Sequence, residues 1–463
     1  MLRLRAIREE LKPMTSLALP VVMAELGWMG MTVVDTMMVG RLNAAAIGAV
    51  SFGALWINVL SFFGLGMLLG LDTLISQSFG AKNLRQCNHY LVQGLWIAVL
   101  LCPPLMLLAM AAIPFTHRWG VDAAIVNAST PYTEALLWSI PPMLFYVVFR
   151  RYLQSMNFVA PVMFALVSAN LVNVLVNWLL IFGNWGMPTL GVAGAGWATT
   201  LSRIYMGGVL LAFILYKESV ASTGLFQTAL RVDWPIVRRL LALGFPVALQ
   251  ICAEYGVFAV ATALIAKLDA IALAAHQIVL NVASVSFMVP LGVSSAGAVR
   301  VGQAVGRQDA EGAVTSGWTA LLLGATFMAF AGVAMLTFPE WVLRVFTSDE
   351  SVFALGIPLL FVAAAFQLFD GIQVTAGGVL RGVGDTRTPM VCNIAGHWGF
   401  GLPIGYYLCF VLGWQALGVW VGLSLGLVAV ALLLLLTWRR SSKRMPEIIA
   451  AVSHDGVHQV TGH

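Results

Sequence analysis

Three acidic residues lie inside long apolar stretches of this sequence, where an ionisable side chain needs a reason to be present. They are Asp35, Glu254 and Asp370. An acid at the centre of a lipid bilayer costs about 2.5–3.5 kcal/mol even on lenient insertion scales. A carboxyl group in such a place can bind and release a proton or supply oxygen ligands to a cation. These residues are therefore the first candidates for a functional site.

Amide side chains accompany the two acids of the second half. Gln250 precedes Glu254 by four residues, so the two share one face of a helix. Gln367 and Gln373 stand three residues before and after Asp370 and share its face in the same way. We expect all three glutamines to line the cavity in which a substrate binds. Glu254 and Asp370 could together hold a Na⁺ ion, or they could share a proton, because two close carboxylates resist ionising together. Buried hydrogen bonding that locks the helices is the structural alternative.

A stripe of asparagines predicts a polar helix face in the first half. Its members, spaced by three and four residues, are Asn170, Asn173 and Asn177. In a membrane such a face must contact protein or water, so we expect these residues to line a cavity. With Asp35, Asn173 and Asn177 would form a proton or substrate subsite. The structural alternatives are interhelical amide bonds and a salt bridge from Asp35 to Arg41 or Lys267.

Four further ionisable residues lie in or beside apolar stretches. Glu25 precedes Asp35 by ten residues, which at about 100° per residue turns it roughly 80° from that side chain; it is a candidate lining residue of an inner cavity. Asp72 is interpreted as structural. His276 and His397 are interpreted as hydrogen-bonded core residues rather than as a proton relay.

The composition restricts the class of protein that can use such residues. Of the 463 residues, 60% are hydrophobic and only 10% are Asp, Glu, Lys or Arg, whereas a soluble domain carries about 25% charged residues. This excludes a soluble enzyme, a nucleic-acid binder, a disordered chain and a disulfide scaffold, and it leaves a polytopic all-α membrane protein. The five cysteines lack CxxC or Cys/His spacing, so neither a metal centre nor a disulfide is indicated.

Apolar runs of about 20 residues, enough to cross a bilayer, predict twelve membrane-spanning helices. They cover 15–39, 46–71, 90–112, 132–149, 161–182, 190–216, 241–265, 272–298, 314–337, 353–378, 390–411 and 416–438. Cytoplasmic loops carry an excess of Lys and Arg. With both termini in the cytoplasm, twenty basic residues lie inside, Arg150 and Arg151 among them as loop residues. Four lie outside: Arg41, Arg118, Lys267 and Arg344.

An internal repeat divides the chain into two similar halves. Residues 17–80 align without a gap on 243–306 and share fifteen identities in sixty-four positions. We therefore predict two lobes of six spans, over 1–226 and 227–445, followed by a short, frayed cytoplasmic tail over 446–463. Six spans per half give both lobes the same orientation in the membrane, a plan found in transporters.

Five short segments resemble the multidrug and toxic compound extrusion (MATE) family, and its NorM-type branch in particular. They are Val34–Leu42, Asp72–Ala81, Leu190–Thr199, Val299–Gln303 and Leu380–Thr386. The resemblance implies two six-helix lobes facing a central cavity and export of lipophilic organic cations, driven by Na⁺ or H⁺.

The NorM-type pattern also suggests roles for individual residues. Its acid in the first helix is matched by Asp35, and those in the seventh and tenth helices by Glu254 and Asp370. The asparagines of its fifth helix correspond to Asn173 and Asn177.

Two positions depart from this pattern. Glu25 stands where the family has an uncharged residue, and Phe366, a turn before Asp370, offers no hydroxyl oxygen to a cation.

We therefore expect a secondary active antiporter of the bacterial inner membrane, monomeric and not an enzyme. Its partners would be small cationic lipophilic drugs or dyes and the lipid bilayer, with no nucleic acid and no cofactor besides the coupling Na⁺ or H⁺. Two alternatives stay open. A flippase of lipid-linked oligosaccharide would need several arginines in its cavity, where only Arg203 lies well within a span. A membrane-embedded lipid transferase would need His/Asp clusters that the short loops lack.

Overall fold

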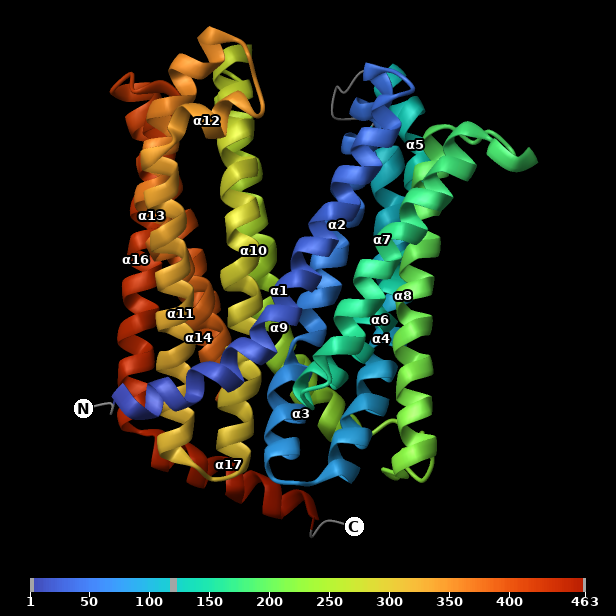
Figure 1. Ribbon diagram of the computed structural model, residues 1–463, viewed down its shortest axis with the longest axis vertical. Helices are drawn as coiled ribbons and strands as arrows, with labels where there is room; N and C mark the ends of the chain where they lie inside the picture. Colours follow the sequence, from blue (N-terminus) through green and yellow to red (C-terminus); the bar gives the residue numbers. More distant parts are fainter. Residues whose placement is uncertain (1–3, 117–122, 461–463) are drawn as a thin grey trace. The chain divides into compact units, whose positions relative to one another are not determined.

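The computed structural model describes residues 4–116 and 123–460, and the regular elements within these ranges are all helical (Figure 1). Long apolar runs fold this way because a lipid environment offers no partner to a backbone N–H or C=O, and a helix satisfies these groups internally. Arg3 and Arg118, which the charge count assigned to opposite sides of the membrane, lie outside the described residues.

The chain forms two compact units, each described here by itself. The N-unit comprises Met23–Ala248, and the C-unit comprises Met1–Val22 and Leu249–His463. Both borders fall inside helices, two residues after Pro20 of α1 and two after Pro246 of α9. A proline inside a helix removes one backbone hydrogen bond and favours a kink. The six-span lobes over 1–226 and 227–445 remain a prediction.

The N-unit takes its helices from the first half of the chain. They are the end of α1 (Leu4–Gly40), α2 (Ala44–Leu68), α3 (Gly70–Gly80), α4 (Leu84–Thr116), α5 (Ala123–Leu137), α6 (Ile140–Ser155), α7 (Val159–Phe182), the short 3₁₀ helix η2 (Asn184–Gly186), α8 (Val192–Ala221) and the start of α9 (Trp234–Ile265). Small residues let these helices approach closely, as where Gly194 of α8 packs on the backbone of Leu180 in α7.

The C-unit takes its helices from the second half and adds the first segment of α1. They are the rest of α9, α10 (Ala270–Gly306), α11 (Ala310–Thr337), α12 (Pro339–Arg344), α13 (Glu350–Gly382), α14 (Arg387–Ile394), the π-helix η3 (Ala395–Gly401), α15 (Leu402–Tyr406), the π-helix η4 (Tyr407–Val411), α16 (Gln415–Lys443) and α17 (Met445–Val460).

Eleven of the predicted spans have a counterpart among the described helices that are long and apolar enough to cross a membrane. Ten are single stretches, and the eleventh is the pair 125–137 and 140–155, which bends by 44° at its break. The predicted span 390–411 is occupied by the consecutive segments α14, η3, α15 and η4, which π-turns interrupt.

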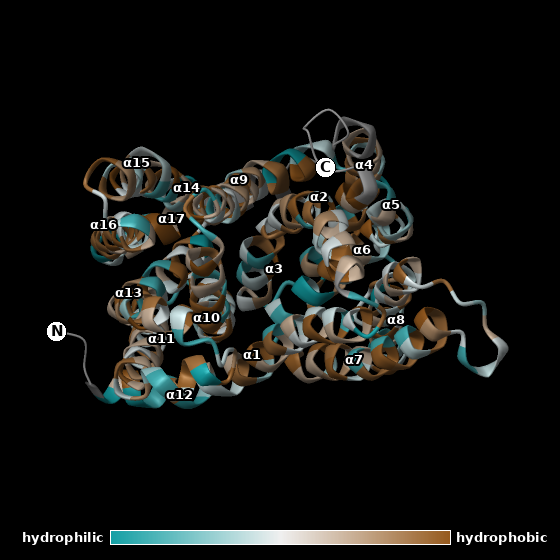
Figure 2. Cartoon of the chain, turned by 90° about the horizontal axis from the view of Figure 1, so that it is seen from above, coloured by the Kyte–Doolittle hydropathy of each residue, from teal (hydrophilic) through white to brown (hydrophobic). Residues whose placement is uncertain are grey.

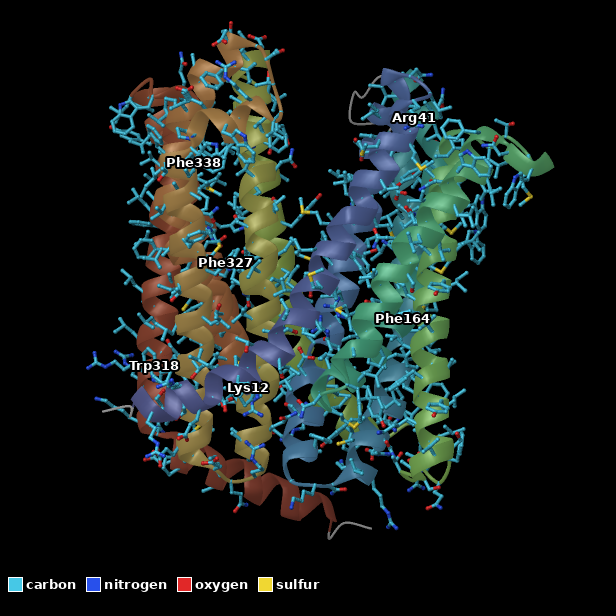
Figure 3. All side chains as sticks on the ribbon, in the orientation of Figure 1. Lys12, Arg41, Phe164, Trp318, Phe327 and Phe338 are labelled. Carbon is cyan, nitrogen blue, oxygen red and sulfur yellow. The ribbon has the colours of Figure 1, made fainter. Side chains whose placement is uncertain are left out.

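Hydrophobic side chains cover much of the helices outside as well as inside. Hydrophobic residues, drawn in brown, run along most helices in Figure 2, and Phe164 on α7 is 61% exposed (Figure 3). Lys12 and Arg41 are exposed and flank the apolar part of α1 (Figure 3). An apolar surface between charged ends suits a helix that crosses the hydrocarbon layer.

The sequence repeat reappears as equivalent helix caps. Asn43 caps α2 by accepting the backbone N–H of Ala46 at 2.7 Å, and Asp269 caps α10 by accepting that of Ala272 at 2.7 Å. Asn43 and Asp269 are matched residues in the shift of 226. Each unit therefore starts its second long helix with the same device.

The polar connector before α9 is anchored to the N-unit rather than free. Asn88, Gln93 and Trp96 of α4 donate hydrogen bonds to backbone carbonyls of residues 223, 231 and 230, at 3.1, 3.0 and 2.7 Å. His89 lies 3.1 Å from the carboxylate of Asp233. These bonds hold the segment along one helix.

The C-terminal tail was predicted to be frayed, and this is wrong for its described part. Residues 445–460 form α17, with Met445 and Ile449 buried. Apolar residues four apart give the tail a helical face to bury, although its length and polarity suggested none.

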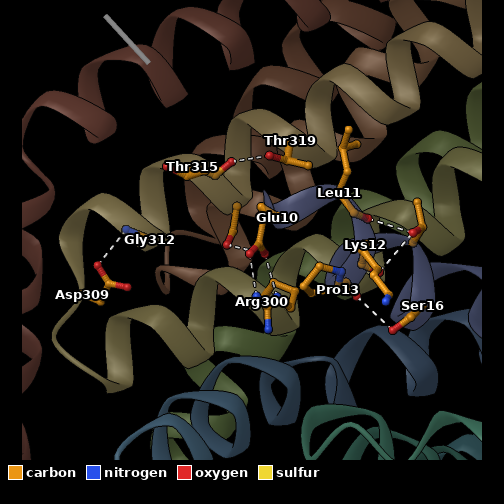
Figure 4. A network of polar contacts seen from close by, with 12 residues as sticks. Glu10, Leu11, Lys12, Pro13, Ser16, Arg300, Asp309, Gly312, Thr315 and Thr319 are labelled. Carbon is orange, nitrogen blue, oxygen red and sulfur yellow. Dashed lines mark hydrogen bonds and ion pairs between the residues drawn. The ribbon is translucent and has the colours of Figure 1, made fainter. Parts of the chain in front are cut away.

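The first segment of α1 is fixed to the other helices of the C-unit by a partly buried ion pair (Figure 4). Glu10 accepts two hydrogen bonds from Arg300 of α10, at 2.7 and 2.6 Å, and one from Ser316 of α11 at 2.9 Å. The side chains of Glu10 and Arg300 are 14% and 19% exposed. A bidentate, shielded pair of this kind holds its geometry better than an exposed one.

We predict that Glu10→Gln lowers the free energy of unfolding by about 3 kcal/mol, because it leaves the charge of Arg300 largely buried without its partner. Thermal unfolding in detergent micelles measures the change. Glu9→Gln is the matched control, since Glu9 pairs with Arg5 on an exposed surface and such pairs contribute little. Equal effects of the two substitutions would contradict the anchoring role.

Candidate functional site

The carboxylate of Glu254 lies in a cluster of amides in the C-unit. Gln373 of α13 donates to Glu254 Oε1 at 2.9 Å, and Asn393 of α14 donates to Oε2 at a longer 3.5 Å. Asn393 also donates to Gln373 Oε1 at 3.4 Å. Gln373 and Asn393 are fully buried. Three helices thus contribute one polar group each to a single site.

Asp370 completes this cluster. It is 7% exposed, and its carboxyl group interacts with the charge of Glu254 and with the neutral amide of Gln373. Neither Glu254 nor Asp370 forms an ion pair with a basic side chain in the described part of the chain. The structure therefore brings together the two acids that the sequence singled out and surrounds them with neutral groups.

Two amides that were predicted to belong with these acids have other neighbours. Gln367 donates to Ser286 Oγ at 2.7 Å and contacts the sulfur of Met335 at 3.4 Å. Gln250 makes no hydrogen bond to Glu254 within the described ranges. A shared helix face places these side chains near the acids, but the facing helices decide which polar group each one meets.

Asp35 is the centre of a second cluster, in the N-unit. Asn177 of α7 donates to Asp35 Oδ1 at 2.6 Å, and Thr199 of α8 donates to Oδ2 at 2.8 Å. Asn177 also donates to Asn173 Oδ1 at 3.1 Å. Asp35 is 7% exposed, and both asparagines are fully buried. The observed partners of Asp35 are thus neutral donors rather than Arg41.

The bond to Thr199 can reverse without any movement of heavy atoms. A hydroxyl group both donates and accepts, whereas an amide N–H₂ only donates. A protonated Asp35 could therefore donate through Oδ2 to Thr199 and keep the bond from Asn177. The cluster is compatible with both protonation states of the acid.

Asn170 forms hydrogen bonds to backbone carbonyls rather than to Asp35. It donates to the carbonyl of Gly27 in α1 at 3.0 Å and to that of Leu166 in its own helix at 2.9 Å. Both contacts are interhelical or local amide bonds. The three asparagines share one stripe but divide between packing and the Asp35 cluster.

Two further acids of the N-unit are paired with arginines. Arg150 of α6 forms an ion pair with Glu25, and Arg151 Nη1 lies 3.4 Å from Asp72 Oδ2. The structural interpretation of Asp72 agrees with this contact. The prediction that Arg150 and Arg151 are loop residues is wrong, because both are buried inside α6. Their guanidinium groups face acids from α1 and α3.

His276 is a satisfied core residue. Its Nδ1 accepts from the indole N–H of Trp420 at 3.1 Å, and its Nε2 lies 2.8 Å from Thr262 Oγ1. An indole nitrogen only donates, so Nδ1 is unprotonated and the neutral ring carries its proton on Nε2. Phe366 stacks on the same Trp420 at a centroid distance of 5.8 Å. This agrees with the predicted hydrogen-bonded role.

Sequence reasoning missed Asn393 and Thr199. Asn393 stands four residues before His397, and Thr199 stands four before Arg203, but neither predicted span contains an acid to draw notice. The signal was this spacing together with the rule that polar groups in a membrane face protein or water. If every Asn and Gln within a predicted span had been taken as a candidate site residue, Asn393 would have been among them.

The comparisons with known proteins agree with one another. The family model MatE matches the chain twice, over residues 20–179 and 246–407, which together exceed half its length. Among curated relatives, the probable multidrug resistance protein NorM of Mesorhizobium japonicum is 36% identical over 448 residues, covering 95% of this chain and 96% of the relative. The multidrug resistance protein MdtK of Yersinia pseudotuberculosis is 31% identical over 443 residues, covering 94% and 96%.

Solved structures show a similar fold. The crystal structure of the eukaryotic MATE transporter AtDTX14 has a TM-score of 0.86 at 21% identity and covers 96% of this chain and 100% of that one. An outward-facing multidrug resistance MATE family transporter of the MOP superfamily has a TM-score of 0.84 at 17% identity, with coverage of 94% and 96%.

We predict that Glu25→Gln destabilises the protein by about 3–5 kcal/mol, because it leaves Arg150 as a buried charge without an acid. The double variant Glu25→Gln, Arg150→Gln should recover most of this loss, as measured by thermal unfolding. Glu447→Gln, which breaks the exposed pair with Arg444, is the control. A Glu25→Gln variant as stable as the parent would show that the pair is not structural.

Proposed function

Because this chain belongs to the MatE family, we propose that it is a secondary active multidrug efflux antiporter that exports lipophilic organic cations in exchange for Na⁺ or H⁺. Membership makes the chain an all-helical, multi-pass membrane protein with the fold of the MATE transporters, and not an enzyme. The names of the relatives support drugs as substrates, and the arrangement of acids supports ion coupling.

The observation that carries the proposal is the acid cluster of the C-unit. Glu254 and Asp370 are two buried carboxylates held by the neutral amides of Gln373 and Asn393. Arg150 and Arg151 give other buried acids a permanent counter-charge, but no described basic side chain pairs with these two. Their balancing charge must therefore come from a mobile ion, which is the property that a coupling site needs.

The Asp35 cluster supports a second role, in the N-unit. Its carboxylate accepts hydrogen bonds from Asn177 and Thr199 and is compatible with both protonation states. Such a group can take up a proton or attract an organic cation. We assign Asp35, Asn173 and Asn177 to a proton or substrate subsite.

Coupling follows if each ligand favours one of two states of the protein. A ligand shifts a conformational equilibrium only by its difference in affinity for the two states. We propose that the ion at Glu254 and Asp370 favours the state that releases the drug outside, and that the drug from the cytoplasm favours the return.

The alternative of an oligosaccharide flippase gains no support from the arginines. Arg203 donates to Ser139 Oγ at 2.6 Å and lies over the ring of Trp28 at 5.5 Å. Arg150 and Arg151 are paired with acids. These contacts already use the cationic groups that an anionic substrate would require.

We also propose that both termini are cytoplasmic and that the protein resides in the bacterial inner membrane. The first segment of α1 and helix α17, both in the C-unit, lie toward the lower end in Figure 1, away from α12. Two ends on one side agree with the charge count that predicts an even number of spans.

We predict that purified protein in liposomes exports a fluorescent organic cation under an imposed Na⁺ or pH gradient. Asp370→Asn and Glu254→Gln should each slow this efflux at least about tenfold, a loss of about 1.4 kcal/mol in the activation free energy. The reason is that an amide cannot bind the coupling proton and is a weaker cation ligand.

Asp309→Asn is the matched control for the aspartate, because Asp309 caps α11 with its side chain and asparagine caps helices equally well. Glu350→Gln, at a largely exposed position, is the control for the glutamate. Ion-driven efflux that survives in Asp370→Asn would refute the proposed mechanism.

A further inference from the structure

His397 was predicted to be a hydrogen-bonded core residue, and the structure contradicts this. It is 1% exposed, and neither Nδ1 nor Nε2 forms a hydrogen bond within the described part of the chain. A neutral imidazole carries one donor and one acceptor, and buried polar groups are normally paired. The residue is therefore either costly to the fold or used by something that binds there.

His276 shows that this is not a general property of buried histidines in the C-unit. Both of its ring nitrogens have partners, Trp420 and Thr262. That arrangement keeps His276 neutral, since Nδ1 already accepts an N–H. His397 has no bond that fixes its protonation state.

The local backbone places His397 one helical turn from Asn393, a residue of the acid cluster. It lies in the π-helix η3, directly after α14. Wider turns with i→i+5 hydrogen bonds bring residues four apart nearly above one another, and such turns occur often at functional sites. His397 follows Asn393 by four residues, so it lies one turn above the amide that donates to Glu254.

The residues on either side of His397 in η3 contact α16 and α9. Gly396 and Gly401 pack on the backbone and Val430 of α16, and Trp398 donates to the carbonyl of Ala253 in α9 at 2.9 Å. The segment that carries His397 therefore packs against both α16 and α9.

The ionisable groups of the packed elements are few. On α9 they are Arg238, Arg239, Cys252, Glu254 and Tyr255, on α13 Glu350, Asp370 and Arg381, on α14 Arg387 and Cys392, and on α15 Tyr406. The basic residues of α16 are Arg439, Arg440 and Lys443 at its far end, more than a helical turn beyond Val430. Of the acids, Glu254 accepts a hydrogen bond from Asn393, one turn before His397, and neither Glu254 nor Asp370 forms an ion pair with a described basic side chain.

We propose that His397 is a third proton-binding group of the C-unit site and that the coupling ion is a proton; this inference rests on the proposed antiport function. A ring nitrogen takes a proton from water through a new N–H bond, and the imidazolium balances the charge of the carboxylates. Release of that proton to a carboxylate leaves a neutral ring and a carboxylic acid, so charge and atoms balance.

The test compares His397→Gln with the matched variant His276→Gln in liposomes, with pH-gradient-driven efflux measured between pH 5 and 8. We expect His397→Gln to slow efflux at least fivefold and to flatten its pH dependence. His276→Gln should lower thermal stability but keep the shape of the pH profile, because that ring has a structural role.

A second measurement does not depend on transport. With ¹⁵N-labelled histidine in the full-length protein, the ring signals of His397 should titrate in this pH range and shift in Glu254→Gln, while those of His276 stay neutral. This readout also covers the case in which His397→Gln folds poorly.

Three outcomes separate the two proposals. A pH profile of His397→Gln that matches the parent, or a His397 ring that does not titrate, overturns the role of His397. Efflux driven by Na⁺ alone overturns proton coupling, while the antiport function stands. Unchanged ion-driven efflux in Glu254→Gln and Asp370→Asn refutes the antiport mechanism itself, whatever His397 does.

Discussion

The structure depends on one constraint: a polar group in hydrocarbon must find its partner inside the protein. Helical hydrogen bonds supply these partners for the backbone. The buried acids find theirs in two ways. Glu25 and Asp72 face arginines, which fixes their charge and makes them part of the scaffold. Asp35 and Glu254 face amides and a hydroxyl, which hold a carboxylate without cancelling its charge. The second arrangement leaves the charge of the carboxylate without a fixed counter-charge, which is what the proposed ion coupling requires.

The two units share a scaffold but not their chemistry. Matched residues cap their second long helices, and matched prolines lie near the borders of the units. At a shift of 226, however, Asp35 corresponds to Ala261 and Glu254 to Trp28. The Asp35 cluster of the N-unit holds one acid near the charge of Arg203, whereas the cluster of the C-unit holds Glu254 and Asp370, which form no ion pair with a described basic side chain. Duplication explains the common fold, and later divergence explains why ion coupling is assigned to one unit.

The sequence predicted what depends on local pattern. The length of the apolar runs located eleven membrane-spanning helices. The scarcity of acidic residues within these runs identified Asp35, Glu254 and Asp370. It could not predict what depends on facing helices. Arg150 and Arg151 follow an apolar run and resemble loop residues, because their acids lie far away in the chain. Gln367 has the spacing of a site residue, yet Ser286 on another helix is its partner. Helical spacing gives the face of a side chain, and only tertiary packing gives its partner.

The same contacts bear on the choice between Na⁺ and H⁺. A Na⁺ site would need several oxygens directed at one point. Here the amides of Gln373 and Asn393 direct N–H groups, not oxygens, at Glu254, and Phe366 supplies no oxygen near Asp370. A cation would have to turn both amides around before it could bind. A proton needs only one free lone pair on a carboxylate, which the long 3.5 Å bond to Asn393 leaves nearly available. The donor geometry therefore supports the proposal of a proton as the coupling ion, as does the unpaired His397, one turn from Asn393.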